Sequence, residues 1–180
     1  MKENPWKTKK SIAVYENPGI KVEENQIINP AGKDGIYGTV RFKNRAMAII
    51  PIDRNGNTWL VGQFRYCLNE YSWEIPMGGG LIGFDFLESA KRELKEETGL
   101  IADKWTELLK IHTSNSVTDE VGVVYLAENL TEGETEFEET EILQIKKLPF
   151  KEALEMVMSG EITDGISLAG ILKAARVLGY

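Results

Sequence analysis

The segment from residue 74 to residue 100, EIPMGGGLIGFDFLESAKRELKEETGL, constrains the fold more than any other part of the chain. It begins with a short apolar strand signal that runs into three glycines, continues through an irregular loop, and ends in an acidic helix. Asp85 is the expected N-cap of this helix, Glu88 occupies the position of a capping-box glutamate, and Gly99 ends it. The segment therefore predicts a strand, a loop and a helix in direct succession.

Two acids of this helix lie beside its apolar side. Glu93 and Glu97 are one turn apart, and they flank a stripe formed by Leu87, Ala90 and Leu94. Like charges one turn apart beside a buried face destabilise a helix unless a cation lies between them. Mg²⁺ would resolve the conflict, because it prefers carboxylate and backbone oxygens and leaves positions open for phosphate. The alternative is the solvated face of an acidic helix.

The spacing resembles the signature of the Nudix hydrolases, G-x5-E-x7-R-E-U-x-E-E-x-G-U, in which U is aliphatic. The fixed positions that match are Gly78, Arg92, Glu93, Leu94, Glu96, Glu97, Gly99 and Leu100. Phe84 stands where the family has its first glutamate, which leaves open how many metal ions the site holds. The resemblance implies that Glu93, Glu97 and the neighbouring Glu96 bind Mg²⁺, with Mn²⁺ as an alternative, and that the backbone carbonyl of Met77 is a further ligand.

The resemblance also implies roles for charged residues outside the metal site. Arg92 would orient Glu96 through an ion pair. Arg65 lies in a stretch similar to the family's R-Q-Y-R pattern, so it would contact substrate phosphates; the alternative is a surface ion pair. Glu120 matches a family position near the terminal sugar. The acidic stretch 131–141 resembles the loop that supplies the general base, for which Glu139 and Glu141 match best and Glu138 is a further candidate.

A nucleobase could stack on an aromatic side chain, for which Tyr15, Tyr37 or Trp73 are candidates. For each of them a place in the core or in an interface is the alternative. His112, the only histidine, is expected to have a structural role at the end of a strand. Cys67, the only cysteine, is expected in or near the core.

Length and charge exclude several other classes of protein. With 180 residues, 42% of them hydrophobic, the chain can bury a full core. A net charge of -7 argues against nucleic acid and anionic membranes as partners. A single cysteine excludes an intramolecular disulfide, no apolar run approaches the length of a membrane span, and MKENPWKTKK lacks the apolar stretch of a signal peptide. A cytoplasmic location is expected.

The order of strand and helix signals predicts an α/β fold. Residues 1–44 are expected to form a small antiparallel strand subdomain with dimer contacts, and residues 45–180 the main domain. In the latter, 46–53 and 58–66 read as a hairpin around an Asn-Gly turn, followed by strands at 71–77, 106–114, 121–130 and 142–149. Helices are predicted at 150–160 and 164–180. A mixed sheet covered on both faces by helices, an α/β/α sandwich, is expected.

Taken with the resemblance, these features predict a Mg²⁺-dependent pyrophosphohydrolase, typically a homodimer. Its substrates would be nucleoside diphosphate sugars such as ADP-ribose or GDP-mannose, cleaved to a nucleoside monophosphate and a sugar phosphate. A hydrolase of nucleoside triphosphates or dinucleoside polyphosphates is one alternative. A non-catalytic nucleotide-sugar sensor is another, which Phe84 keeps open.

Overall fold

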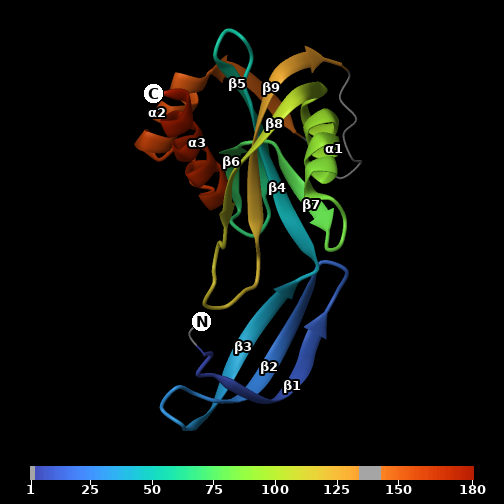
Figure 1. Cartoon of the computed structure of the whole chain (residues 1–180), viewed down its shortest axis with the longest axis vertical. Helices are drawn as coiled ribbons and strands as arrows, with labels where there is room; N and C mark the ends of the chain where they lie inside the picture. The colour runs from blue at the N-terminus through green and yellow to red at the C-terminus, as the bar shows by residue number, and fades with distance from the viewer. Residues whose placement is uncertain (1–2, 134–142) are drawn as a thin grey trace.

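Three β-sheets form the framework of the chain in a computed structural model that describes residues 3–133 and 143–180 (Figure 1). The first sheet is antiparallel and has the order β1 (Lys7–Glu16), β2 (Ile20–Ile28), β3 (Asp34–Phe42). The second is also antiparallel and has the order β10 (Gln144–Pro149), β5 (Asn57–Arg65), β6 (Glu70–Glu74). The third is mixed, because β4 and β9 pair in parallel, and has the order β7 (Met77–Leu81), β4 (Asn44–Pro51), β9 (Gly122–Glu132), β8 (Leu100–Ile111).

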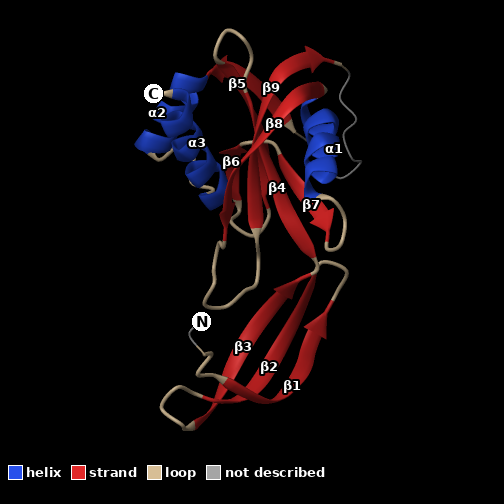
Figure 2. Ribbon diagram, in the orientation of Figure 1, coloured by secondary structure: helices blue, strands red, loops and turns tan. Residues whose placement is uncertain are grey.

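Helices lie on both sides of the second and third sheets (Figure 2). One side carries α1 (Phe86–Thr98), and the other carries α2 (Phe150–Ser159) and α3 (Gly165–Leu178). This arrangement confirms the predicted α/β/α sandwich with a mixed sheet. The first sheet is antiparallel, as predicted for the N-terminal unit, and it extends away from the helices (Figure 1). None of the described helices has the length and hydropathy needed to cross a membrane.

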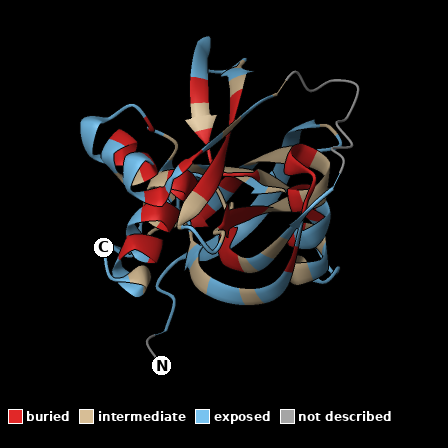
Figure 3. Ribbon diagram, turned by 90° about the horizontal axis from the view of Figure 1, so that it is seen from above, coloured by how far each residue is buried: buried red, intermediate tan, exposed pale blue. Residues whose placement is uncertain are grey.

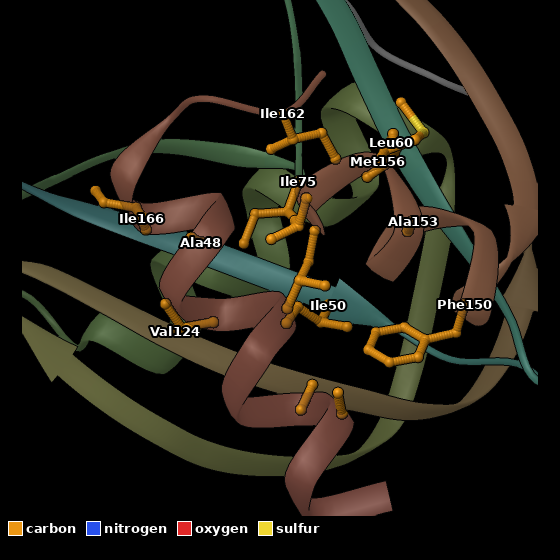
Figure 4. Packing of buried hydrophobic residues seen from close by; sticks show 14 of the residues in the cluster. Ala48, Ile50, Leu60, Ile75, Val124, Phe150, Ala153, Met156, Ile162 and Ile166 are labelled. Carbon is orange, nitrogen blue, oxygen red and sulfur yellow. The ribbon is translucent and has the colours of Figure 1, made fainter. Parts of the chain in front are cut away.

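Strand β4 separates two apolar clusters, because its side chains alternate between the two faces of the sheet. Met47 and Ile49 pack towards α1, whereas Ala48 and Ile50 pack towards α2 and α3, and all four are fully buried. Figure 4 shows the second of these clusters, in which Phe150 contributes the largest side chain. Figure 3 shows buried residues concentrated where the strands lie between helices. A strand buried on both faces reads as a continuous apolar run, which is the pattern of residues 46–53.

The predicted hairpin between residues 46–53 and 58–66 is wrong, although its turn is present. Gly56, with φ at +76°, donates its N–H to Asp53 O at 3.0 Å, so the chain reverses where the Asn-Gly signal predicts. The flanking strands then diverge into different sheets: β4 pairs with β7 and β9, and β5 pairs with β6 and β10. The Asn-Gly signal predicts only that the chain reverses. It does not decide which strands pair, because both edges of β4 and both edges of β5 are occupied by strands from elsewhere in the chain.

The strand predicted at 71–77 is divided by Ile75 and Pro76 into β6 and β7, which belong to different sheets. The glycines that follow lie within β7 and pair with β4. The strand predicted at 106–114 begins earlier, at Leu100, directly after the end of α1. The remaining predicted strands and helices are confirmed with shifts of a few residues at their ends.

Candidate active site

Helix α1 has a defined beginning and end, which fix the orientation of its acidic residues. Asp85 Oδ1 accepts from Leu87 N at 2.8 Å and from Glu88 N at 3.2 Å, as an N-cap does. Gly99, with φ at 71°, ends the helix by donating its N–H to Lys95 O at 2.8 Å. Both predicted caps are confirmed. The Glu88 carboxylate accepts from Lys91 at 2.7 Å, in an ion pair on the exposed side of the helix.

Glu93 and Glu97 are buried, with 8% and 2% of their surface exposed. The Glu97 carboxylate accepts from the amide of Met77 at 2.8 Å, which ties α1 to the start of β7. A Cβ atom built on Gly78 would lie 2.0 Å from the carboxyl carbon of Glu93, so only glycine allows this carboxylate to lie against the strand. A burial of this kind is costly for a charged group unless it is paired with a cation.

Arg92 connects the acidic residues of α1 to β7. Its guanidinium forms ion pairs with Glu93 and with Glu96, and it donates to Gly79 O at 3.2 Å. The predicted pair between Arg92 and Glu96 is therefore present. Its charge compensates part of the negative charge of the helix and holds both carboxylates in fixed positions.

A cleft of about 840 Å³ opens beside this segment, between the end of β5, the start of β7 and the beginning of α3. Its walls include three predicted site residues, Arg65, Met77 and Glu120. Other residues that line it are Phe42, Asn44, Arg45, Tyr66, Cys67, Glu74, Gly78, Gly79, His112, Thr113 and Asp164. The structure thus places residues from β7, from the end of β5 and from the β8–β9 connection around one cavity.

Arg65 lies in this cleft as one half of an ion pair with Glu74. Arg65 Nε donates to Glu74 Oε1 at 2.8 Å, and Nη2 contacts the other carboxylate oxygen, so the pair is bidentate. Glu74 is 2% exposed, whereas the Arg65 side chain is 39% exposed. The hydrogen bond with Glu74 raises the pKa of the Arg65 guanidinium above its ordinary value. The pair holds the Arg65 guanidinium in place at the wall of the cleft.

Glu120 lines the same cleft, in the connection between β8 and β9. Its carboxylate accepts from the hydroxyl of Thr113, and its own N–H donates to Thr118 Oγ1 at 3.3 Å. His112 directly follows β8 and is exposed in the same cleft, at the strand end where it was predicted. The expectation that Cys67 lies in or near the core is wrong, because it is exposed at the cleft.

The structure does not bring the predicted aromatic residues into this cleft. Tyr37 lies on β3, where its hydroxyl donates to Ser116 O and its ring meets Trp6 edge-on at 5.5 Å. Trp73 packs against the apolar cluster of α2 and α3, with Lys146 Nζ 4.2 Å from the ring centre. Tyr15 is exposed on β1. The aromatic residues that do line the cleft are Phe42 and Tyr66.

The residues predicted as general base, Glu139 and Glu141, and the further candidate Glu138 lie outside the described residues. Their roles stay predictions.

Several residues of the cleft were missed by sequence reasoning. The sequence did contain a signal for Glu74, because it is an acid in an otherwise apolar strand. An acid at such a position is rarely buried without a partner, and Glu74 is buried. Asn44, Arg45 and Tyr66 also line the cleft. No local pattern marks these three, since they come together only through the pairing of distant strands.

The residues at the start of β7 and on α1 fit a hard divalent cation. Glu93 and Glu97 supply buried carboxylates, and Gly78 leaves the space that the first of them occupies. Within the described residues, no group of three or more histidine, cysteine, aspartate or glutamate side chains is arranged to hold a metal ion by itself. This donor set suits Mg²⁺ or Mn²⁺, because Mg²⁺ is usually bound through one or two carboxylates, with water and substrate phosphates completing its shell.

Comparisons with known proteins identify a family and several relatives. The NUDIX domain matches residues 42–164. The ADP-ribose pyrophosphatase of Mycobacterium tuberculosis is 32% identical over 181 residues, covering 98% of this chain and 86% of the relative. That of Bacillus subtilis is 31% identical and covers 91% of this chain and 89% of the relative. A crystal structure of an ADP compounds hydrolase superposes with a TM-score of 0.88 at 19% identity, covering 99% of this chain and 97% of that one, which shows the shared fold.

Proposed function

The chain belongs to the Nudix hydrolase family and is a pyrophosphatase, and on this premise we propose that it cleaves nucleoside diphosphate sugars in a reaction that depends on Mg²⁺ or Mn²⁺. The products would be a nucleoside monophosphate and a sugar phosphate. ADP-ribose is the first substrate to test, since the two relatives described above are ADP-ribose pyrophosphatases. The observation that carries the proposal is the placement of the buried Glu93 and Glu97 against Met77 and Gly78, next to a cleft that also contains Arg65.

In this proposal Glu93, Glu97, Glu96 and the Met77 carbonyl would hold the metal. When bound, the cation would neutralise charge on the diphosphate and polarise its phosphorus-oxygen bonds. The Met77 amide orients Glu97 through its 2.8 Å hydrogen bond. Arg92 positions Glu96 and Glu93 by its ion pairs, so these carboxylates need little rearrangement when a substrate arrives.

Arg65 would bind a phosphate oxygen of the substrate. Its pairing with the buried Glu74 holds the guanidinium in place, and its partial exposure leaves part of it accessible from the cleft. Removal of a proton from the attacking water needs a nearby carboxylate, for which we propose Glu139 or Glu141. Glu120 would contact the terminal sugar. Neither Tyr37 nor Trp73 lines the cleft, so each could stack only on the base of a substrate bound by another subunit.

A single assay tests the proposed reaction. Purified protein with Mg²⁺ is given ADP-ribose, GDP-mannose, UDP-glucose, ATP and diadenosine tetraphosphate in separate reactions, and phosphate is measured with and without added phosphatase. Nucleoside diphosphate sugars should release phosphate only after the phosphatase is added, since both products are phosphomonoesters. Turnover of ATP or diadenosine tetraphosphate alone would contradict the proposed substrate class, and turnover of none would favour a sensor.

We further propose that residues 1–44 form a dimerisation unit attached to a hydrolase domain of residues 45–180. The support is a set of exposed apolar side chains on the first sheet, Val14 and Tyr15 on β1 and Ile36 on β3. Apolar side chains left exposed on a small sheet can be covered by a contact with another protein surface. Sedimentation at micromolar concentration should give a dimer, and a monomer there would overturn this part of the proposal.

A further inference from the structure

The connection between β8 and β9 is attached to the first sheet along the end of β3. Val40 N donates to Val117 O at 2.9 Å, and Asp119 N donates to Val40 O at 3.3 Å. Val40 and Thr118 form a parallel bridge, and the Tyr37 hydroxyl donates to Ser116 O. The connection therefore runs beside β3 as a short added strand, and its position depends on the first sheet.

Asp119 links this connection to the cleft. Its Oδ1 accepts from Phe42 N at 2.8 Å, and its backbone carbonyl accepts from Arg45 Nη1 at 3.0 Å. Phe42 ends β3, and Arg45 is the second residue of β4, so Asp119 holds the corner between these strands. Both partners line the cleft. The more exposed Arg41 contacts the same carboxylate at 3.5 Å, a long surface pair of little energetic weight.

Glu120, the next residue, points into the cleft. Its carboxylate accepts from the Thr113 hydroxyl, so both ends of the β8–β9 connection meet at this side chain. Consecutive residues of an extended chain project to opposite sides, which explains how Asp119 can reach the β3–β4 corner while Glu120 reaches the cleft. The location of the Glu120 carboxylate is consequently set by Asp119 on one side and by Thr113 on the other.

We infer that Asp119 is a positioning residue that fixes the wall of the cleft formed by Glu120, Phe42 and Arg45, where the sugar phosphate half of the substrate binds. The inference rests on the proposed function, since it specifies one side of the same site. Asp119 acts through the Phe42 amide and through the backbone of Glu120, and it does not touch substrate. Loss of its carboxylate should weaken recognition of the sugar phosphate and leave the metal-binding side of the cleft intact.

The test compares Asp119→Ala with Asp119→Asn in ADP-ribose hydrolysis. Alanine removes the acceptor of the Phe42 N–H, and KM is expected to rise about tenfold while kcat stays within about twofold, the size expected when one hydrogen bond that fixes a binding wall is lost. Asparagine keeps an oxygen acceptor at this position and should return KM to within about threefold of the wild type. The inhibition constant of AMP, which lacks the sugar phosphate, should not change.

Asp34→Asn is the control, because Asp34 is an aspartate at the start of β3 whose ion pair, with Lys9, lies on the exposed surface of the first sheet. An equal KM for Asp119→Ala and Asp34→Asn would overturn the inference. So would a parallel weakening of AMP inhibition, or a failure of Asp119→Asn to restore KM. If Asp119→Ala does not fold, Asp119→Glu replaces it, since the longer acid keeps the charge but displaces the acceptor and should raise KM in the same way.

The same measurements distinguish a failure of the proposed function from a failure of this inference. Wild-type turnover of the substrate panel reports on the proposed function alone. The dissociation constant of ADP-ribose, measured by calorimetry without added metal, reports on the Asp119 wall independently of turnover. It should rise about tenfold in Asp119→Ala, and an unchanged value would overturn the inference even if the wild type hydrolyses ADP-ribose.

Discussion

Replacement of Gly78 by alanine tests the close contact between β7 and the acidic face of α1. The added Cβ would lie 2.0 Å from the Glu93 carboxyl carbon and 2.0 Å from its Oε2. Carbon atoms in contact prefer a separation of about 3.5–4.0 Å, so the carboxylate or the strand must move by about 1.5 Å. A displacement of about 1 Å in a catalytic arrangement can lower activity by about 10²-fold. We therefore expect Gly78→Ala to lose at least about 10²-fold in kcat/KM and to bind Mg²⁺ more weakly.

Overpacking at this site should also destabilise the protein by about 1–3 kcal/mol, which corresponds to a Tm decrease of about 2–4 °C per kcal/mol for a chain of this size. Initial rates, Mg²⁺ calorimetry and thermal unfolding measure the three effects.

Gly79→Ala is the matched control for this substitution. A Cβ on Gly79 would meet the Asn44 side chain at 3.4 Å, an ordinary contact, and neither glycine has a positive φ. The two variants therefore differ in what the new methyl group touches and not in backbone strain. If Gly78→Ala retained activity and Mg²⁺ affinity within about threefold of Gly79→Ala, the contact with Glu93 would not be what requires glycine, and the reasoning would be refuted.

Three further predictions follow from the same site and from the turn before β5. Glu97→Gln should lower kcat by about 10³-fold with folding retained, since the amide oxygen can still accept from the backbone, whereas Glu88→Gln should have little effect; equal losses would refute the ligand assignment. Arg65→Met leaves Glu74 buried without its partner and should lower the free energy of unfolding by about 1–3 kcal/mol, less than the loss of a fully buried pair would. Adding Glu74→Gln should restore Tm but not substrate affinity. Restored affinity would exclude a contact between Arg65 and phosphate. Burial raises the pKa of Asp53, but hydrogen bonds within its turn outweigh burial and lower the pKa. The ionised Asp53 carboxylate therefore stabilises the fold above about pH 4, and this stabilisation is lost as the pH falls through the lowered pKa. Asp53→Asn should make the difference in Tm between about pH 7 and pH 3 smaller, and an unchanged difference would contradict this.

The layers of the fold were accessible from the sequence because local signals agree with them. Asp85 and Gly99 cap α1 as predicted, and the continuous apolar run at 46–53 is a strand buried on both faces. The pairing of strands was less accessible. The Asn-Gly turn at Gly56 predicts a hairpin, but β4 and β5 enter different sheets because distant strands occupy their edges. Such pairing depends on contacts between residues far apart in the chain, which a local pattern does not encode.

Some residues of the candidate site could likewise be predicted from the sequence, and others could not. Residues fixed by spacing on one helix, such as Glu93 and Glu97, could be predicted to lie together beside an apolar stripe, and the structure shows that both are buried. The partner of Arg65 could not, because the buried Glu74 lies on the neighbouring strand and out of register with it. The role assigned to Asp119 had no signal at all, since its contacts with Phe42 and Arg45 exist only after the first sheet meets the β8–β9 connection.

The two-sided burial of β4 has a consequence for how this chain can change over evolutionary time. The residues alternate along the strand: Met47 and Ile49 belong to one apolar cluster, and Ala48 and Ile50 belong to the other. A substitution in this strand that alters side-chain volume must be absorbed in one cluster without shifting a backbone that the other cluster also uses. In a saturation mutagenesis experiment, β4 should therefore tolerate few replacements, and accepted changes on its two faces should be accompanied by compensating changes in α1 on one side and in α2 or α3 on the other.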